Sequence, residues 1–130
     1  MPQLGIRRAL SYGFDEALAK LPAALKAEGF GVLTEIDVQD TLKRKLGIDF
    51  RRYRILGACN PPLAHHALSA NLEVGLMLPC NLIVYEDDDG QAVVVAVDPL
   101  RTIAAQEEPS LAALATTVSE KLTRVLASLG

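Results

Sequence analysis

Hydrophobic residues recur at helical spacing in two parts of the chain. The first stripe predicts a helix over residues 14–28, and its members are Phe14, Ala17, Leu18, Leu21 and Leu25. Gly29 supplies a stop signal after this helix. Pro22 falls inside the stripe and predicts a kink there, or two shorter segments, because an interior proline costs a helix about 3 kcal/mol.

The second stripe is longer and predicts a final helix after residues 107–110. Its members follow i, i+3, i+4, i+7 spacing: Leu111, Leu114, Ala115, Val118, Leu122, Val125, Leu126 and Leu129. Two shorter helices are predicted between the stripes. One spans residues 41–46 with Asp40 as its N-cap, and the other runs from Pro61 to about Ala70 with Asn60 as its N-cap. Residues 72–77 are expected to be irregular or a short turn.

Shorter runs rich in apolar and β-branched residues predict strands. These runs cover residues 4–10, 31–38, 53–58, 82–86 and 91–97. In the second strand, Val32, Thr34 and Ile36 are expected to share one side. The last two runs flank Asp87-Asp88-Asp89-Gly90, which predicts a hairpin, and Asp98-Pro99 ends it.

A four-residue hairpin loop pairs Glu86 with Gln91 and fixes the predicted faces. Cys80, Leu82 and Val84 then share one face with Val93, Val95 and Val97. The other face holds Asn81, Ile83 and Tyr85 with Ala92, Val94 and Ala96. Asn81 and Asp98 become diagonal neighbours, and Cys80 points away from them.

The order of the elements predicts an α+β fold. A mainly antiparallel sheet carries helices on one face, and residues 1–130 form a single domain. The hairpin strands are apolar at almost every position, so the second face of the sheet also needs a cover. We expect a homodimer to provide it.

Composition excludes several classes of protein. Half of the 130 residues are hydrophobic and 22% are charged, which is typical of a folded globular chain. The net charge of −3 does not favour general nucleic-acid binding. The N-terminus lacks the apolar run of a signal peptide, and the apolar run at residues 93–97 is too short to span a membrane. We therefore expect a cytoplasmic protein with reduced cysteines and no membrane partner.

Two short clusters contain both cysteines of the chain. Each cysteine is followed by asparagine and lies beside a proline: Ala58-Cys59-Asn60-Pro61 and Leu78-Pro79-Cys80-Asn81. Cys59 lies near the predicted helix N-terminus, where a thiol can have a lowered pKa. If the strand that ends at Cys59 lies beside the strand that begins at Cys80, the two thiols are candidates for a reversible disulfide or sulfur carriage. The alternative is that both are small buried hydrophobic residues. Asn60 as a helix cap and Asn81 as an anchor at a strand start would then shape the backbone.

Two other clusters contain candidate binding residues. Cys59, one of His65 and His66, Cys80 and Asp98 make a weak candidate set of zinc ligands, with a spacing that matches no standard motif. Basic residues gather between Lys43 and Arg54, where Asp49 alone opposes them, and this segment can contact an anion or nucleic acid. The more common interpretation of such a segment is a solvated helix face and strand edge without a binding role. Neither cluster predicts a bound metal or cofactor.

Several segments together resemble the domain-of-unknown-function family 302. The resemblance rests on 29–37 (GFGVLTEID), 46–50 (LGIDF), 56–64 (LGACNPPLA), 78–86 (LPCNLIVYE) and 98–99 (DP), with matching order from about Leu4 to Ile103. It implies a curved antiparallel sheet with two main helices, similar to the TATA-box-binding-protein arrangement, and it suggests homodimers. It implies no activity.

The sequence therefore predicts a binding module and identifies no reaction. The predicted ligand-binding residues are Cys59, Asn60, Cys80, Asn81 and Asp98. The alternatives are a thiol or sulfur enzyme or carrier that uses Cys59 with Cys80, and a nucleic-acid module that uses residues 43–54.

Overall fold

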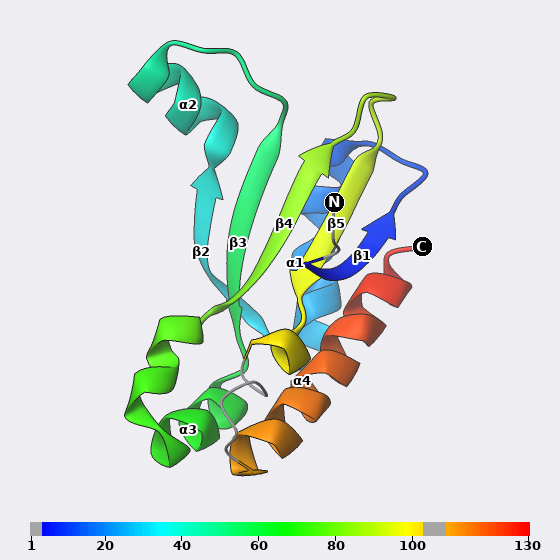
Figure 1. Ribbon diagram of the computed structural model, residues 1–130. Helices are drawn as coiled ribbons and strands as arrows, with labels where there is room; N and C mark the ends of the chain where they lie inside the picture. Colours follow the sequence, from blue (N-terminus) through cyan, green and yellow to red (C-terminus); the bar gives the residue numbers. More distant parts are fainter. Residues whose placement is uncertain (1–3, 103–108) are drawn as a thin grey trace.

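The computed structural model describes residues 4–102 and 109–130, which form a five-stranded sheet with helices (Figure 1). The strands are β1 (Gly5–Ala9), β2 (Gly31–Asp37), β3 (Tyr53–Cys59), β4 (Cys80–Glu86) and β5 (Ala92–Val97). The α-helices are α1 (Phe14–Ala27), α2 (Val38–Leu46), α3 (Pro61–Ala70) and α4 (Pro109–Ser128). Two 3-10 helices are η1 (Leu72–Met77) and η2 (Pro99–Arg101). Residues 107 and 108, expected to introduce the last helix, lie outside the described residues.

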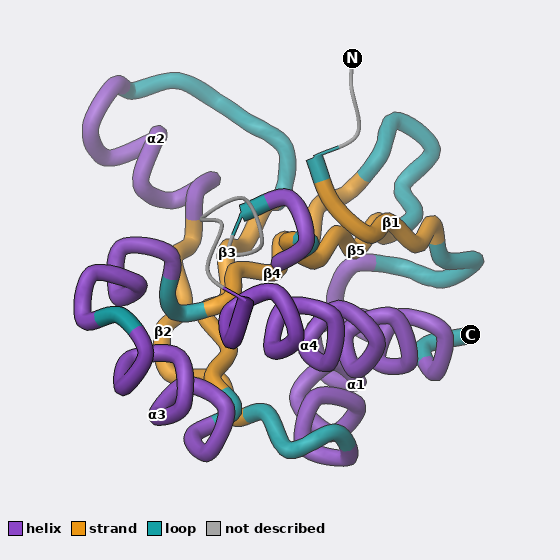
Figure 2. Tube along the Cα trace, turned by 60° about the horizontal axis from the view of Figure 1, so that its bottom comes forward, coloured by secondary structure: helices purple, strands orange, loops and turns teal. Residues whose placement is uncertain are grey.

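Every strand pairing in the sheet is antiparallel. The strand order is β1-β5-β4-β3-β2, so the two edges come from the first two strands of the chain. Figure 2 shows α1 and α4 side by side on one face of this sheet. The predicted α+β fold, with helices packed on one face, is confirmed.

The core lies between the sheet and the two long helices. It buries the apolar stripe of α1, the predicted stripe of α4, and alternate residues of the central strands: Leu56, Ala58, Cys80, Leu82, Val84, Ala92, Val94 and Ala96. A smaller cluster of Ala67, Val74, Leu111, Leu114 and Ala115 joins α3 and η1 to α4. Burial of these apolar side chains is the main force that holds the layers together.

Two helices differ from their predictions. Helix α1 runs from Phe14 to Ala27 without interruption, although Pro22 lies inside it. Pro22 is exposed, so the hydrogen bond that it cannot donate is missing on the solvent side of the helix. Helix α2 begins earlier than expected, because Asp37 and not Asp40 is the N-cap: the Asp37 carboxylate accepts from the Asp40 backbone N–H at 3.0 Å.

The predicted hairpin exists, but its register was wrong by one residue. Glu86 pairs with Ala92, not Gln91, and Leu82 pairs with Ala96. The loop is longer than expected because the Asp87 carboxylate accepts from the backbone N–H groups of Asp89 and Gln91, at 2.9 Å each. The shift moves the valines of β5 to the other face, so Val93, Val95 and Val97 lie with Asn81, Ile83 and Tyr85.

Strand β2 also differs in its pairing. Val32 pairs with Ala58 and Thr34 pairs with the next residue, Gly57, so Leu33 is an extra residue in a β-bulge. The predicted alternation of Val32, Thr34 and Ile36 on one side is therefore broken.

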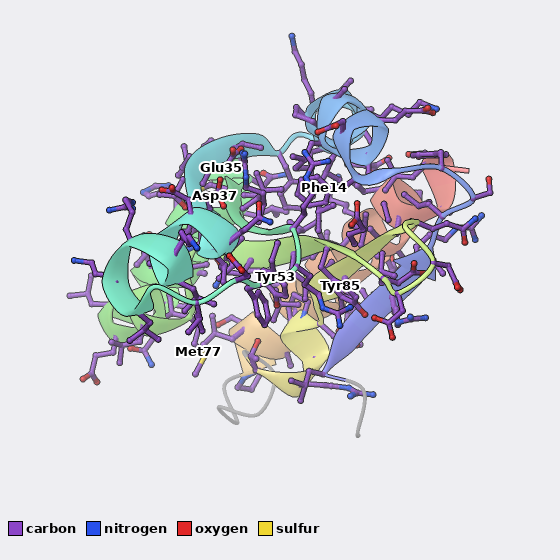
Figure 3. All side chains as sticks on the ribbon, turned by 90° about the horizontal axis from the view of Figure 1, so that it is seen from above. Phe14, Glu35, Asp37, Tyr53, Met77 and Tyr85 are labelled. Atoms are coloured by element: carbon purple, nitrogen blue, oxygen red, sulfur yellow. The ribbon has the colours of Figure 1, made fainter. Side chains whose placement is uncertain are left out.

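The second face of the sheet lies on the side away from α1 and α4. Figure 3 shows Tyr53, Tyr85 and Met77 on this side and Phe14 on the other. Tyr53 and Tyr85 stack with their ring centroids 5.8 Å apart. We call this side, which carries Ile36, Tyr53, Ile55, Asn81, Ile83, Tyr85, Val95 and Val97, the uncovered face.

Candidate functional site

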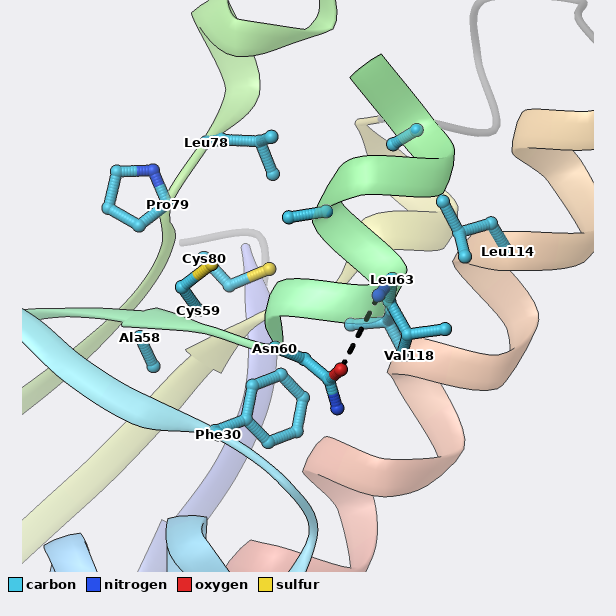
Figure 4. A pocket seen from close by; sticks show the side chains of 12 residues that line it. Phe30, Ala58, Cys59, Asn60, Leu63, Leu78, Pro79, Cys80, Leu114 and Val118 are labelled. Atoms are coloured by element: carbon cyan, nitrogen blue, oxygen red, sulfur yellow. Dashed lines mark hydrogen bonds between the residues drawn. The ribbon is translucent and has the colours of Figure 1, made fainter. Parts of the chain in front are cut away.

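An apolar pocket lies where β3 and β4 meet α3 and α4 (Figure 4). Its lining residues are Phe30, Ala58, Cys59, Asn60, Leu63, Ala64, Ala67, Leu78, Pro79, Cys80, Leu114 and Val118. None of them carries a charge. The internal space is about 30 Å³, which is enough for about one water molecule.

The first Cys-Asn cluster forms one end of this pocket. Cys59 is the last residue of β3, and Asn60 is the N-cap of α3, with Pro61 at the first helical position as predicted. The Asn60 Oδ1 accepts from the backbone N–H of Leu63 at 3.5 Å. Its Nδ2 donates to the backbone carbonyl of Glu28 at 3.3 Å. Both ends of the Asn60 amide are therefore used by the protein itself.

The second Cys-Asn cluster begins β4. Cys80 is 7% exposed and belongs to the main core. Burial raises the pKa of its thiol to about 11, because a thiolate would lose its hydration there. Cys80 is therefore a neutral thiol at neutral pH, without the character of an activated nucleophile.

The cysteines do not form the predicted pair. The strands that carry them are neighbours, but Cys80 pairs with Ala58 and Cys59 lies one position beyond. Both residues line the pocket beside α3, but both thiols are free and no disulfide joins them.

The two asparagines have different environments, which the repeated Cys-Asn motif did not indicate. Asn81 is exposed, pairs with Gly57 on the uncovered face, and has no side-chain hydrogen-bond partner among the described residues. The expected anchoring role of Asn81 was therefore wrong.

Asp98 lies away from the predicted position beside Asn81. Because of the one-residue register shift, Val97 and not Asp98 shares the face of Asn81. The Asp98 carboxylate instead accepts from the backbone N–H of Leu100 at 3.0 Å and caps η2. In the structure, Asp98 therefore stabilises the start of η2.

The weak metal set is not assembled in the structure. Within residues 4–102 and 109–130, no three His, Cys, Asp or Glu side chains come together as possible metal ligands. His65 and His66 are both exposed on α3.

The basic segment is largely neutralised by carboxylates from other parts of the chain. Ion pairs join Lys43 to Asp49, Arg44 to Asp40, Arg51 to Asp88, Arg52 to Asp15, and Arg54 to both Glu35 and Asp37. The sequence showed only Asp49 as an opposing charge, because the other partners lie on β2, α1, α2 and the hairpin loop. This arrangement disfavours a surface for nucleic-acid phosphates.

The described helices include none that is long and apolar enough to span a bilayer.

The sheet, the helices and the pocket together define an α+β domain in which helices cover one face of the sheet. The model of the family described as "Domain of unknown function DUF302" matches residues 6–129, and the chain belongs to this family. A comparison with curated proteins finds no match.

A solved structure agrees with this assignment. It is the crystal structure of an uncharacterized conserved DUF302 protein from Bacillus stearothermophilus. It is 33% identical to this chain, with a TM-score of 0.89 over 97% of this chain and 98% of that chain. The resemblance inferred from the sequence is therefore confirmed, while the family description identifies no activity.

Proposed function

We propose that this protein is a homodimeric binding module that holds a small uncharged ligand in the apolar pocket beside Cys59. The observation that carries the proposal is the lining of that pocket: apolar side chains from four elements converge there, and none of the described lining residues is charged. Apolar concave sites of this kind recognise ligands through shape and burial of surface.

The small volume of the pocket defines how a ligand enters. With about 30 Å³ of internal space, only an outward movement of one wall admits a larger group. Helix α3 is the wall that moves with least loss of burial, since Ala67 is its only fully buried residue.

Binding is better supported than catalysis. The Cys80 thiol is neutral, since burial raises its pKa to about 11, and the Asn60 amide is occupied by backbone groups. A thiol reaction that uses Cys59 with Cys80 would require the buried, neutral Cys80 thiol to ionise, and burial opposes this. We therefore do not retain the thiol alternative.

An NMR titration with benzene tests the pocket. Leu63→Ala enlarges it and should produce saturable methyl shifts at Leu114 and Val118, whereas Ala64→Leu should fill it and suppress them. Leu72→Ala, at a residue 85% exposed on η1, is the matched control. Shifts that never saturate in the Leu63→Ala variant, or that saturate equally in the Ala64→Leu variant, would contradict the proposed site.

The uncovered face supports the homodimer. Ile36 is 49% exposed, and Ile55, Ile83 and Val95 are partly exposed on the same side. Apolar side chains that are contiguous on a sheet are a common basis for association. A twofold dimer covers the same face of both copies at once.

Analytical ultracentrifugation tests the dimer. The expected mass is twice the 14.0 kDa of the chain. Ile83→Lys places a charge in the uncovered face and should yield a folded monomer, while Thr117→Lys, on the exposed side of α4, should leave the dimer intact. A wild-type monomer throughout the micromolar range would refute this part of the proposal.

A further inference from the structure

A second hollow lies on the uncovered face, at the end of the sheet next to η1. Its volume is about 270 Å³, and its walls include Leu76, Met77, Pro79, Asn81, Val97 and Thr102. Figure 3 shows Met77 on the same side of the sheet as Tyr53 and Tyr85. This hollow is larger than the internal space beside Cys59 and approaches the lower end of the range of small-molecule sites, about 300–1,000 Å³.

Asn81 is the distinctive residue of this hollow. The chain has three asparagines, and the other two are helix caps: Asn60 accepts from Leu63 N–H, and Asn71 accepts from the Glu73 N–H at 2.9 Å. The Asn81 side chain is exposed and forms no hydrogen bond with any described residue. Asparagine is disfavoured in strands, so this position has no evident structural reason for an amide.

The free amide defines the chemistry of a ligand. A carboxamide presents a hydrogen-bond acceptor and donors side by side, and its best complement is another amide-like edge. None of the described residues that line the hollow is charged, and Met77, Pro79 and Val97 supply apolar walls. A charged ligand would lose hydration there without a compensating partner.

We propose that this hollow binds a small neutral molecule with a carboxamide, lactam or imide edge on an apolar ring. The edge pairs with the Asn81 side chain, and the ring packs between Met77 and Val97. Thr102, which also borders the hollow, provides a hydroxyl for a second polar group. All of these residues come from one copy of the chain.

This site is separate from the pocket beside Cys59. That pocket is lined by core residues such as Ala58 and Cys80, which face the helices. Asn81 and Val97 lie on the opposite face of the sheet. Among the residues that the structure describes, Leu78 and Pro79 alone line both spaces.

Benzamide is the probe for an NMR titration of the full chain. Saturable shifts are expected at the Asn81 side-chain NH₂, the Met77 methyl and the Val97 methyls. Benzoate, which has the same ring and a negative charge, should bind at least about fivefold more weakly. The methyl signals of Leu114 and Val118 monitor the pocket beside Cys59, and their chemical shifts should not change.

Asn81→Leu keeps the size of the side chain and removes its hydrogen bonds. It should raise the benzamide Kd at least about fivefold, whereas Thr117→Ala, on the exposed side of α4, should leave the Kd unchanged. Because Asn81 is exposed, its loss should not unfold the protein, and an unchanged amide spectrum elsewhere verifies this. Equal binding by the wild type and the Asn81→Leu variant would overturn the proposal.

A dimer formed through the uncovered face can cover this hollow, so the titration is repeated with Ile83→Lys. Binding by either the wild type or this variant, with loss on Asn81→Leu in the same background, supports the site. The absence of saturable shifts in both overturns it. This result is independent of the benzene titration, which reports different residues.

Discussion

The Asn60 side chain joins the start of α3 to the end of α1, because its Nδ2 donates to the Glu28 carbonyl at 3.3 Å. The same side chain caps α3 through Leu63 N–H. Gly29, which follows Glu28, has a φ of +86°, and a side chain there would meet the Asn60 amide at 2.9 Å. One asparagine therefore fixes the meeting point of two helices and a strand.

Asn60→Ala should destabilise the protein by about 1–2 kcal/mol, since it removes a helix cap and leaves the Glu28 carbonyl without this donor. Urea unfolding measures the change. Asn71→Ala, which removes the cap of the short η1 helix, is the matched control and should have a smaller effect. Equal losses in the two variants would show that the link between α1 and α3 contributes nothing.

The Cys80 thiol should make stability depend on alkaline pH. Its pKa is raised by burial from 9.0 to about 11, so the unfolded chain loses this proton at lower pH than the folded chain. Stability is therefore fully present below about pH 9 and declines toward pH 11, by about 2–3 kcal/mol for two pKa units. Cys80→Ala should remove this part of the slope in urea unfolding at a series of pH values.

The thiol reactivity of Cys80 gives a second check of the same property. In the folded protein at pH 7.5, a chromogenic disulfide should not modify Cys80, whereas denatured protein should react at both cysteines. Rapid modification of Cys80 in the native state would contradict the burial that raises its pKa.

Gly57→Ala should destabilise the sheet. An added Cβ would clash with the Thr34 Oγ1 and come within 2.6 Å of the Pro79 Cγ, and overpacking of this kind costs about 1–3 kcal/mol. Gly31→Ala, in the neighbouring strand, has no atom within 4 Å of the added Cβ and should change stability by less than about 0.5 kcal/mol. Thermal unfolding of both variants, and of Gly57→Ala combined with Thr34→Ala, measures the clash; no recovery in the double variant would exclude Thr34 as its cause.

Arg54→Ala should remove the ion pairs that hold β2 to β3 near their ends. Arg54 contacts both Glu35 and Asp37, and its side chain is only 29% exposed, so a loss of about 1 kcal/mol is expected. The loss should shrink in 1 M salt, which screens exposed charges. Arg44→Ala disrupts a more exposed pair with Asp40 and should cost less; a larger loss there would contradict this ranking.

The spacing of hydrophobic residues along the chain was sufficient to predict the strands, the long helices and the fold class. The stripes of α1 and α4 are buried as predicted, because a helix places every third or fourth residue on one face. The Asn60 cap and Pro61 start were also correct, since capping chemistry is local in sequence. These features depend on neighbours only a few residues apart.

Register and charge pairing could not be predicted in the same way. The Asp87 hydrogen bonds lengthen the hairpin loop by one residue, and this single residue exchanges the faces of β5. Likewise, Arg52 pairs with Asp15, which is 37 positions away. The difference between Asn60 and Asn81 has the same origin: the same Cys-Asn dipeptide lies beside different partners in the two places.

The order of the strands also affects how the chain folds during synthesis. β1 is made before the other four strands, yet its one strand partner in the described part of the chain is β5, the last of them. At a synthesis rate of about 5–20 residues per second, β1 remains without that partner for on the order of ten seconds. The apolar side of α1 also remains largely exposed during this time, because β4, β5 and α4, against which it packs, are synthesised late. The newborn chain therefore exposes an apolar helix and an unpaired strand until its final third has left the ribosome, so its N-terminal segment is the part that most needs protection by a chaperone.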